Sequence, residues 1–468
     1  MVFSTSSFLF LFLPAVVIGY HLLSLVTKKL SNLFLFLVSL VFYCWNGSEY
    51  AWLLLLSVAA NYLFAILLHL SKGKKARLFF LLLALLTNLG LLGYYKYANF
   101  FLENLSLLTG REYALRKIVL PVGISFYTFQ ALSYVIDVYR GAEPIRNPID
   151  LGTYITFFPQ LIAGPIVRYG QIRDSLRERT VTRSDFFDGM TRFLTGLCKK
   201  VILANNLGAL ADIVFNGGRV TKFSVLMLWL AAVAYSLQLY YDFSGYSDMA
   251  IGLGRLFGFS FPENFRFPYA ASSITDFWRR WHMTLSGWFR DYVYIPLGGS
   301  RVRPARHILN LFLVWLLTGL WHGAAWQFLF WGLAYFLLLL AEKYLIHPER
   351  FRSGIPGLLY RIPTLVCICL LWVVFRAGDL HTAFSFIGGL FGAGPDTVVD
   401  AYSLFQLREY SFFLVAGLLF AVPFFPRLEK RHPGLYTGLH ALLLLLGTLL
   451  SVSFIMKDAY NPFLYFQF

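Results

Sequence analysis

The chain has 468 residues, of which 58% are hydrophobic, 19% aromatic and only 14% charged. Soluble domains of ordinary composition are far less apolar, and at about 20 apolar residues per span the chain has room for roughly twelve membrane spans. The formal net charge of +16 would suggest nucleic-acid binding in a soluble protein. Here the basic residues lie in loops between apolar segments, where they set membrane topology, so we expect no nucleic-acid partner. The composition predicts an all-α polytopic membrane protein, surrounded by the lipid bilayer, with about 11–12 transmembrane helices plus re-entrant helices.

The first part of the chain contains apolar segments at about 8–26, 32–45, 50–70, 78–95 and 119–138. The first segment has no basic region before it and no small-residue cleavage site, so we interpret it as a retained helix and not as a signal peptide. Basic residues at 28–29 and 72–77 mark cytoplasmic loops and place the N-terminus outside.

The run from Ile149 to Val167 is apolar but is interrupted by Pro159, Gly164 and Pro165. A helix broken in this way suits a re-entrant hairpin packed against protein better than a lipid-facing span.

Further spans are predicted at about 186–214, 224–245, 308–321, 326–345, 362–376, 411–425 and 438–456. Basic residues at 350–361 and 427–431 mark cytoplasmic loops, and the loop 377–410 should lie outside. With twelve spans, both termini are extracytoplasmic. The four cysteines lie in or beside apolar runs, and we interpret them as core residues that form neither a disulfide nor a metal site.

The stretch from Ser273 to Gly323 contains two of the nine histidines, His282 and His322, and each follows a tryptophan. The segment around His282 is rich in arginine and aromatic residues, whereas His322 ends an uncharged apolar run. An imidazole in a lipid-embedded helix must find polar partners, so such a residue is a functional-site hypothesis by default. The alternative is a structural histidine that ties one helix to another.

The sequence WRRWH at 278–282 has the spacing of one continuous helix. In such a helix Trp278 and His282 share a face, and Asp276 can reach Arg279 or Arg280. We expect this helix to lie at the membrane surface or to dip into it.

Asp242 and Asp248 lie near a predicted membrane boundary, in the sequence YDFSGYSDMAIGLG. Six residues apart, two carboxylates do not share a helix face, which argues against an acid–base pair. We interpret the glycines as sites of close helix packing and the carboxylates as partners of neighbouring arginines.

The last residues, 458–468, read DAYNPFLYFQF. Exposed aromatic residues at this density would promote aggregation, so something must cover them. They form either an aromatic belt that anchors the last helix, or a tail that folds back into the protein and brings the Tyr465 hydroxyl near the site.

Several motifs together resemble the membrane-bound O-acyltransferase (MBOAT) family, in particular its AlgI-like branch of polysaccharide O-acetyltransferases. They are PVGISFYTFQALSYVIDVYRG from Pro121, FPQLIAGPIVR from Phe158, YYDFSGYSDMAIGLG from Tyr240, WRRWH, LGGSR from Leu297 and GLWHG with His322. The resemblance implies a single membrane domain over 1–457 with its core motifs in 119–323, and a separate extracytoplasmic tail over 458–468. It also implies a ring of helices around a central tunnel, in a bacterial cell membrane.

The resemblance further implies transfer of an acetyl group from cytoplasmic acetyl-CoA, with no bound cofactor and no metal. A hydroxyl is a weak nucleophile, so a neutral imidazole must take its proton, and His322 is expected to be that base, deep in the tunnel. His282, nearer the cytoplasmic face, would orient the thioester or polarise its carbonyl. Trp278, Trp281 and Trp321 would line the tunnel.

Two further roles are implied for residues nearer the two membrane faces. Arg279 and Arg280 would hold phosphates of acetyl-CoA, or else serve only as topology charges. Tyr465 would accept the acetyl group as a phenyl ester, from which an extracytoplasmic SGNH or esterase-like partner would pass it to a polysaccharide acceptor.

Two rival interpretations remain at the level of the sequence. A transporter or polysaccharide exporter would use the histidines as proton-relay groups and form no acyl bond, although the two halves of the chain show no obvious repeat. A D-alanyl transferase to teichoic acid would use a carrier-protein donor in place of acetyl-CoA.

Overall fold

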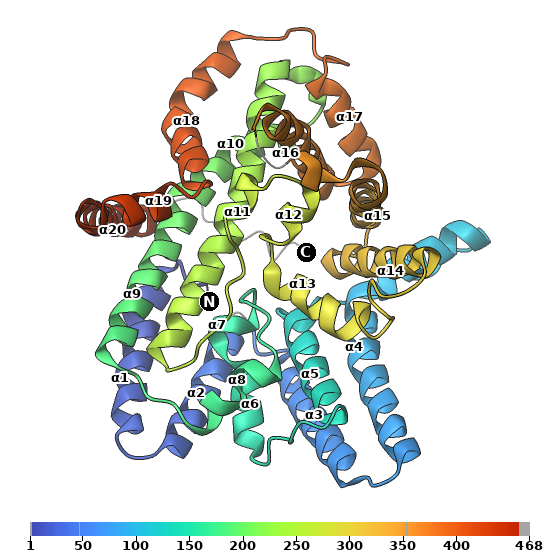
Figure 1. The fold of residues 1–468 in the computed structure, drawn as a ribbon, viewed down its shortest axis with the longest axis vertical. Helices are drawn as coiled ribbons and strands as arrows, with labels where there is room; N and C mark the ends of the chain where they lie inside the picture. Colours follow the sequence, from blue (N-terminus) through green and yellow to red (C-terminus); the bar gives the residue numbers. More distant parts are fainter. Residues whose placement is uncertain (1, 46, 352–353, 458–468) are drawn as a thin grey trace. The chain divides into compact units, whose positions relative to one another are not determined.

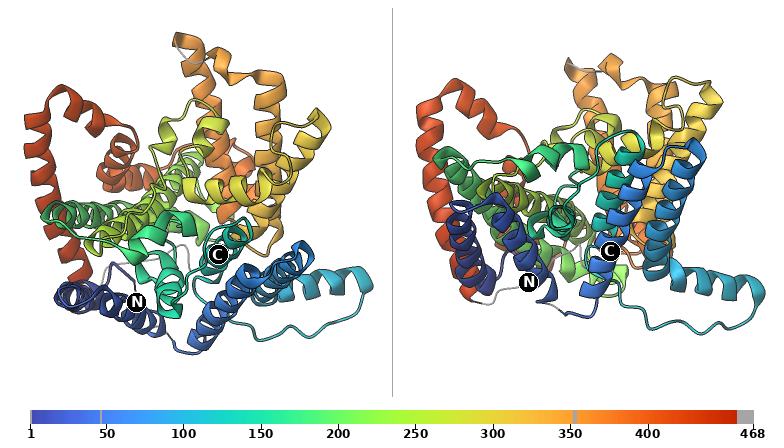
Figure 2. Two further views of the ribbon diagram at one scale, coloured as in Figure 1. Left: turned by 60° about the horizontal axis from the view of Figure 1, so that its bottom comes forward. Right: turned by 90° about the horizontal axis from the view of Figure 1, so that it is seen from below.

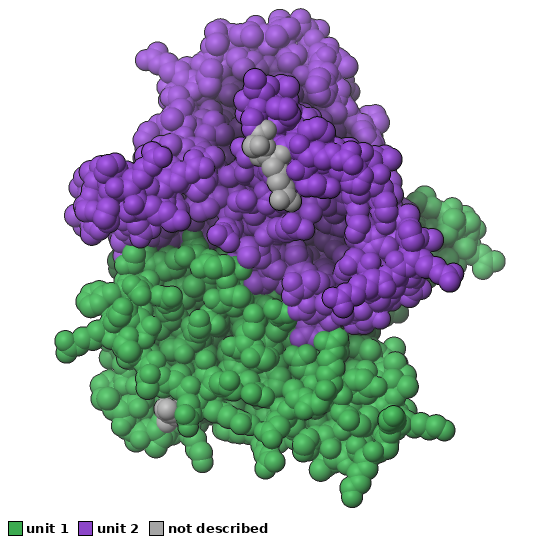
Figure 3. Space-filling view, in the orientation of Figure 1, with its two compact units in different colours: residues 1–193, 247–263 green, residues 194–246, 264–468 purple. Residues whose placement is uncertain are grey.

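A computed structural model describes residues 2–45, 47–351 and 354–457, and every regular element in this part of the chain is a helix. The all-α prediction is therefore confirmed. The chain forms two compact units, which Figure 3 distinguishes by colour: unit 1 is Met1–Phe193 with Ser247–Glu263, and unit 2 is Leu194–Tyr246 with Asn264–Phe468. The single membrane domain expected over 1–457 stays a prediction.

Unit 1 is built mainly from the N-terminal helices (Figure 1). They are η1 (Phe8–Phe12), α1 (Leu13–Ser24), α2 (Lys28–Cys44), α3 (Ala51–Leu70), α4 (Lys74–Thr109), α5 (Ile124–Tyr139), α6 (Pro148–Thr156), α7 (Phe158–Leu161), α8 (Tyr169–Arg177) and α9 (Arg183–Cys198), which continues into unit 2. The helix α4 has 36 residues, so at 1.5 Å per residue it is about 54 Å long and exceeds the hydrocarbon core of a bilayer. Its C-terminal part and the following loop extend away from α3 and α5 (Figure 2).

The segment predicted as a broken, protein-packed hairpin lies inside unit 1. Every side chain from Leu151 to Val167 is buried, and the helix breaks at Phe157, between α6 and α7. Pro159 then occupies the first turn of α7, where its missing N–H leaves no hydrogen bond unmade. Both the predicted interruption and the predicted burial are confirmed.

Unit 2 contains the following helices (Figure 1). They are η2 (Lys199–Ala204), α10 (Asn205–Phe215), η3 (Val220–Lys222), α11 (Val225–Leu256, which ends in unit 1), η4 (Pro268–Ala270), α12 (Ile274–Trp278), α13 (Met283–Phe289), η5 (Arg290–Tyr294), α14 (Pro304–His322), α15 (Trp326–Ala341), η6 (Glu342–Ile346), η7 (Pro348–Phe351), α16 (Gly354–Arg376), α17 (Leu380–Leu390), α18 (Ala401–Phe420), α19 (Phe424–Arg431) and α20 (Pro433–Met456).

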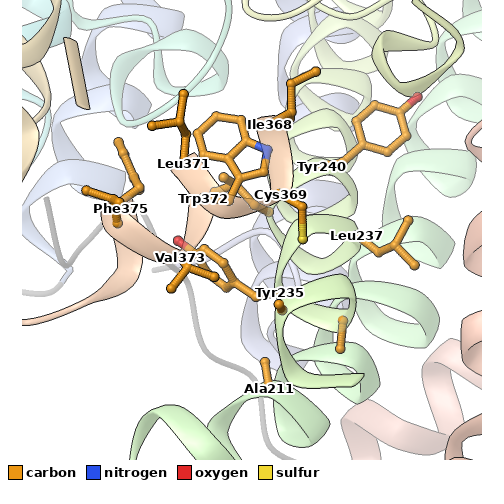
Figure 4. Close-up of a cluster of buried hydrophobic side chains, with 14 of the residues drawn as sticks. Ala211, Tyr235, Leu237, Tyr240, Ile368, Cys369, Leu371, Trp372, Val373 and Phe375 are labelled. Atoms are coloured by element: carbon orange, nitrogen blue, oxygen red, sulfur yellow. The ribbon is translucent and has the colours of Figure 1, made fainter. Parts of the chain in front are cut away.

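The core of unit 2 is aromatic where α11 and α16 meet. Figure 4 shows Tyr235 of α11 beside Val373 and Trp372 of α16, with Phe375 and Tyr240 on opposite sides of the cluster. The helices α14 and α15 approach closely because Gly332 has no side chain: a Cβ there would lie 2.5 Å from the backbone oxygen of Trp315. Small residues at such crossings are typical of helix packing in membranes.

By length and composition, six helices in the described part of the chain can cross a membrane, or seven if the α18–α19 pair, bent by 60°, is one span. Three shorter apolar helices lie at Phe8–Ser24, Lys29–Cys44 and Leu380–Leu390. The polytopic class is confirmed, and the number of 11–12 spans, which counts shorter segments, stays a prediction. The loop predicted over 377–410 is wrong in two parts. The helix α17 forms there, with Asp379 accepting a hydrogen bond from the Thr382 N–H at its start, and α18 already begins at Ala401.

The two carboxylates of α11 belong to different units and have different partners. In unit 1 Asp248 lies 2.6 Å from the guanidinium of Arg192, as predicted. In unit 2 Asp242 lies 2.7 Å from the ammonium of Lys200, so its partner is a lysine and not the expected arginine. Close packing at a glycine is also confirmed, because a Cβ on Gly245 would lie 2.8 Å from the backbone oxygen of Gly196. The four cysteines are free thiols.

Candidate active site

The WRRWH segment does not form the continuous helix that its spacing predicts. The helix α12 ends at Trp278, and α13 begins after His282, whose backbone is left-handed with φ of 42°. Trp278 and His282 therefore share no helix face. The predicted contact of Asp276 is confirmed for Arg280, at 2.9 Å.

The break arises because a segment without regular structure, residues 264–266, takes up backbone hydrogen bonds near His282. The N–H of Met283 donates to the backbone oxygen of Asn264, and the N–H of Arg266 donates to that of Arg280, both at 2.9 Å. A left-handed conformation is costly for a residue with a Cβ, and such residues cluster at functional sites.

His282 is buried, with 1% of its surface exposed, and aromatic rings surround it. Its ring centroid lies 4.6 Å from that of Phe243, 6.5 Å from Phe265 and 5.8 Å from Trp321. Its Nδ1 atom lies 3.0 Å from Oδ1 of Asn264, whereas its Nε2 atom is buried and has no hydrogen-bond partner among the described residues. Burial lowers the pKa of His282, because it disfavours the charged ring. The side chain is neutral at physiological pH.

The start of α12 is held by a carboxylate from another helix. Glu342, buried at the end of α15, accepts hydrogen bonds from the backbone N–H groups of Ile274 at 2.7 Å and Thr275 at 2.8 Å. It also accepts from the hydroxyls of Thr275 and Tyr360, at 2.6 and 2.9 Å. A negative charge at a helix N-terminus is favourable, and four donors satisfy this one although it is buried.

His322 is the last residue of α14 and is 8% exposed. Its ring centroid lies 5.1 Å from each of Trp331 and Phe375 and 4.9 Å from Trp321. Trp321 therefore contacts both histidines. The structure brings His282 and His322, 40 positions apart in the sequence, to the same indole ring.

The three predicted tunnel tryptophans are all buried. Trp278 packs against Trp315 and Tyr335, each at 4.8 Å, and Trp331 at 5.5 Å. Trp281 packs against Trp372 at 4.9 Å (Figure 4 shows Trp372 on α16). In the described part of the chain, the Nε1 atoms of Trp278 and Trp331 and the hydroxyl of Tyr335 are buried without hydrogen-bond partners.

Sequence reasoning missed several residues around the histidines: Asn264, Trp315, Trp331, Tyr335, Glu342, Trp372 and Phe375. Only Glu342 has a signal in the sequence, since it is a carboxylate directly after the uncharged run Trp326–Ala341. Asn264 lies in a polar segment, PENFRF, that no periodicity distinguishes.

The two arginines of WRRWH differ in their surroundings. Arg279 is exposed, whereas Arg280 is half-buried and engaged by Asp276. The expected acceptor Tyr465 belongs to 458–468, outside the described residues. Among the residues that the structure describes, no group of three histidine, cysteine or acidic side chains is arranged to hold a metal.

Comparison with known proteins gives the family. Residues 145–351, which include both histidines, match MBOAT, the membrane-bound O-acyltransferase family. The chain is 40% identical to a protein named "Probable alginate O-acetylase AlgI" from Pseudomonas putida, over 100% of both chains. It is 37% identical to a peptidoglycan O-acetyltransferase from Helicobacter pylori, over 84% of this chain and 80% of that protein. A teichoic acid D-alanyltransferase from Bacillus subtilis is 28% identical, over 56% of this chain and 69% of that protein.

The chain belongs to the membrane-bound O-acyltransferase family, and it is a multi-pass membrane enzyme that transfers acyl groups to oxygen. Within the family it belongs to the AlgI-like branch, as the motifs predict.

Proposed function

We propose that the protein transfers an acetyl group from cytoplasmic acetyl-CoA across a bacterial cell membrane, for the O-acetylation of an extracytoplasmic polysaccharide. The observation that carries the proposal is the burial of His322 among aromatic rings, at the end of a helix whose sequence falls in the matched family region. The relatives at 40% and 37% identity, which cover most of the chain, both carry names of O-acetylating proteins.

In the proposed reaction, His322 is the general base. It takes the proton of an acceptor hydroxyl while the hydroxyl oxygen attacks the thioester carbonyl carbon, and the proton then passes to the departing sulfur as the C–S bond breaks. Buried donors on Trp278, Trp331 and Tyr335 are available to polar atoms of the substrate, since buried donors favour a partner. These aromatic side chains would line the central tunnel that the proposed circle of helices surrounds.

The proposed donor site lies on the cytoplasmic side, at the mouth of this tunnel. Arg279 is exposed and is available to a phosphate of acetyl-CoA. Arg280 is already paired with Asp276, so its contribution to phosphate binding would be smaller.

The proposed acceptor route uses the C-terminal tail. With both termini extracytoplasmic, Tyr465 would receive the acetyl group as a phenyl ester, and its phenolate would be a good leaving group when the acetyl group is transferred a second time. An SGNH or esterase-like partner outside the membrane would then deliver it to the polysaccharide.

Of the alternatives, transfer of D-alanine to teichoic acid is supported more weakly than acetyl transfer, because the relative with that name is only 28% identical over about half of the chain. A transporter without acyl chemistry does not agree with the family, whose members are O-acyltransferases.

The route through Tyr465 is tested by incubating purified protein with isotope-labelled acetyl-CoA and measuring the mass of the C-terminal peptide. We expect the label on the wild-type peptide and none on that of Tyr465→Phe, which keeps the aromatic ring but lacks the hydroxyl. Equal polysaccharide acetylation by both proteins in cells would reduce the tail to an anchor, while leaving the acetyl-CoA chemistry in place.

A further inference from the structure

The hydrogen bonds around Asn264 determine which way its side-chain amide points. Its Oδ1 atom lies 3.3 Å from the backbone nitrogen of Thr284 and 2.9 Å from the Thr284 hydroxyl oxygen. A backbone N–H can only donate, so the Asn264 atom that faces it must be the carbonyl oxygen and not the amide nitrogen. Asn264 is fully buried, and its backbone oxygen also holds the N–H of Met283.

The same oxygen lies 3.0 Å from Nδ1 of His282. Because an amide oxygen only accepts hydrogen bonds, Nδ1 must donate and must therefore carry the proton of the neutral ring. The other ring nitrogen, Nε2, is then left with a lone pair. Asn264 thus fixes both the orientation and the tautomer of His282.

The lone pair of Nε2 has no partner among the described residues, and the atom is buried. A buried acceptor without a partner is costly and is rare in native proteins, so a ligand that donates a hydrogen bond fits here. A neutral ring in this tautomer cannot donate to a carbonyl oxygen from Nε2, which argues against polarisation of the thioester by His282.

We infer that Asn264 is a positioning residue of the active site, which holds His282 with Nε2 as a hydrogen-bond acceptor for an N–H or O–H group of the substrates. This inference rests on the proposed function. Two sources offer such a donor group: the amide N–H groups in the arm of a thioester such as acetyl-CoA, and the hydroxyl that receives the acetyl group.

The test measures kcat and KM for acetyl-CoA consumption by purified full-length protein, with the extracytoplasmic partner and polysaccharide supplied so that Tyr465 is regenerated. Asn264→Leu has a similar volume but no acceptor, so the proton is free to move to Nε2, and we expect kcat/KM to fall about 10- to 100-fold, as for the loss of one buried hydrogen bond. Asn264→Asp keeps an oxygen opposite Nδ1, so it should retain activity within about tenfold of wild type. A raised KM would identify the arm of acetyl-CoA as the donor group, and a lowered kcat at unchanged KM would identify the acceptor hydroxyl.

A double variant separates positioning from a merely structural role. If Asn264 acts through His282, Asn264→Leu should change kcat/KM less than about twofold in a His282→Ala background. The matched control is Asn88→Leu, which removes a buried asparagine of α4 that exchanges hydrogen bonds with Asn61; it should lower thermal stability without changing kcat/KM of the folded protein.

Two results would overturn the inference: a loss of kcat/KM much greater than about tenfold in a folded Asn264→Asp protein, or an undiminished effect of Asn264→Leu in the His282→Ala background. The first result does not depend on whether the leucine variant folds. Absence of acetyl-CoA consumption by the wild-type protein would instead contradict the proposed function.

Discussion

At the scale of single residues, the two histidines could be identified from the sequence. The residues that hold the site in place, Asn264 and Glu342, could not. His282 and His322 stand in short motifs with tryptophan, and an ionisable group in an apolar run is a signal by itself. Asn264 is 18 positions from His282, and Glu342 is 68 positions from Ile274. Their roles depend on contacts that only the folded chain creates, so no local pattern could assign them.

The burial of His282 predicts a pH dependence of stability. Its pKa is lowered from 6.5 to about 3 in the folded protein, so the unfolded chain binds a proton first as the pH falls. The stability due to the neutral ring is complete above pH 6.5 and decreases below it, by about 1.4 kcal/mol per pH unit at most, until the folded ring also titrates.

We therefore expect the thermal midpoint of the wild-type protein to fall more steeply between pH 6.5 and 5 than that of His282→Asn, which has no titratable ring at this position. Thermal unfolding in one detergent at several pH values measures this difference. Parallel pH profiles of the two proteins would show that His282 is not held neutral by burial.

At the scale of elements, hydropathy located the long apolar helices, but it could not locate the break in WRRWH. The interruption at His282 follows from hydrogen bonds with residues 264–266, which compete with helix continuation and lie outside the pattern. The helix α17 was missed because, at 11 residues, it is too short to be recognised as a span.

The position of α12 is predicted to depend on Glu342. Glu342→Gln removes the negative charge and puts an N–H₂ group where an oxygen now accepts hydrogen bonds from Ile274 or Thr275. Loss of one charge-assisted hydrogen bond costs about 1.5–3 kcal/mol, so we expect a lower thermal midpoint and reduced acetyl-CoA turnover.

The control for this change is Glu409→Gln, which makes the same substitution at an exposed position of α18. It should leave both the thermal midpoint and the turnover unchanged. A Glu342→Gln protein as stable and as active as this control would remove Glu342 from the support of the site.

At the scale of the whole molecule, composition alone indicated a polytopic membrane protein, since a chain with 58% hydrophobic residues is far more apolar than an ordinary soluble domain. The division into two units could not be predicted from it, because α9 and α11 each run from one unit into the other. All the described residues assigned to the chemistry, from Asn264 to Phe375, belong to unit 2. The proposed function therefore depends first on the chemistry of His322 within that unit.

The most direct test is acetyl-CoA turnover by purified wild-type protein and His322→Ala, with the partner and polysaccharide present. The control is His440→Ala, at a half-buried histidine of α20. Loss of a general base lowers rates by about 10²- to 10⁴-fold, so we expect a decrease of that size in His322→Ala, at unchanged thermal stability, and normal turnover in His440→Ala. Turnover by His322→Ala equal to that of the wild-type protein would contradict the account, because the buried imidazole would then have no part in the transfer.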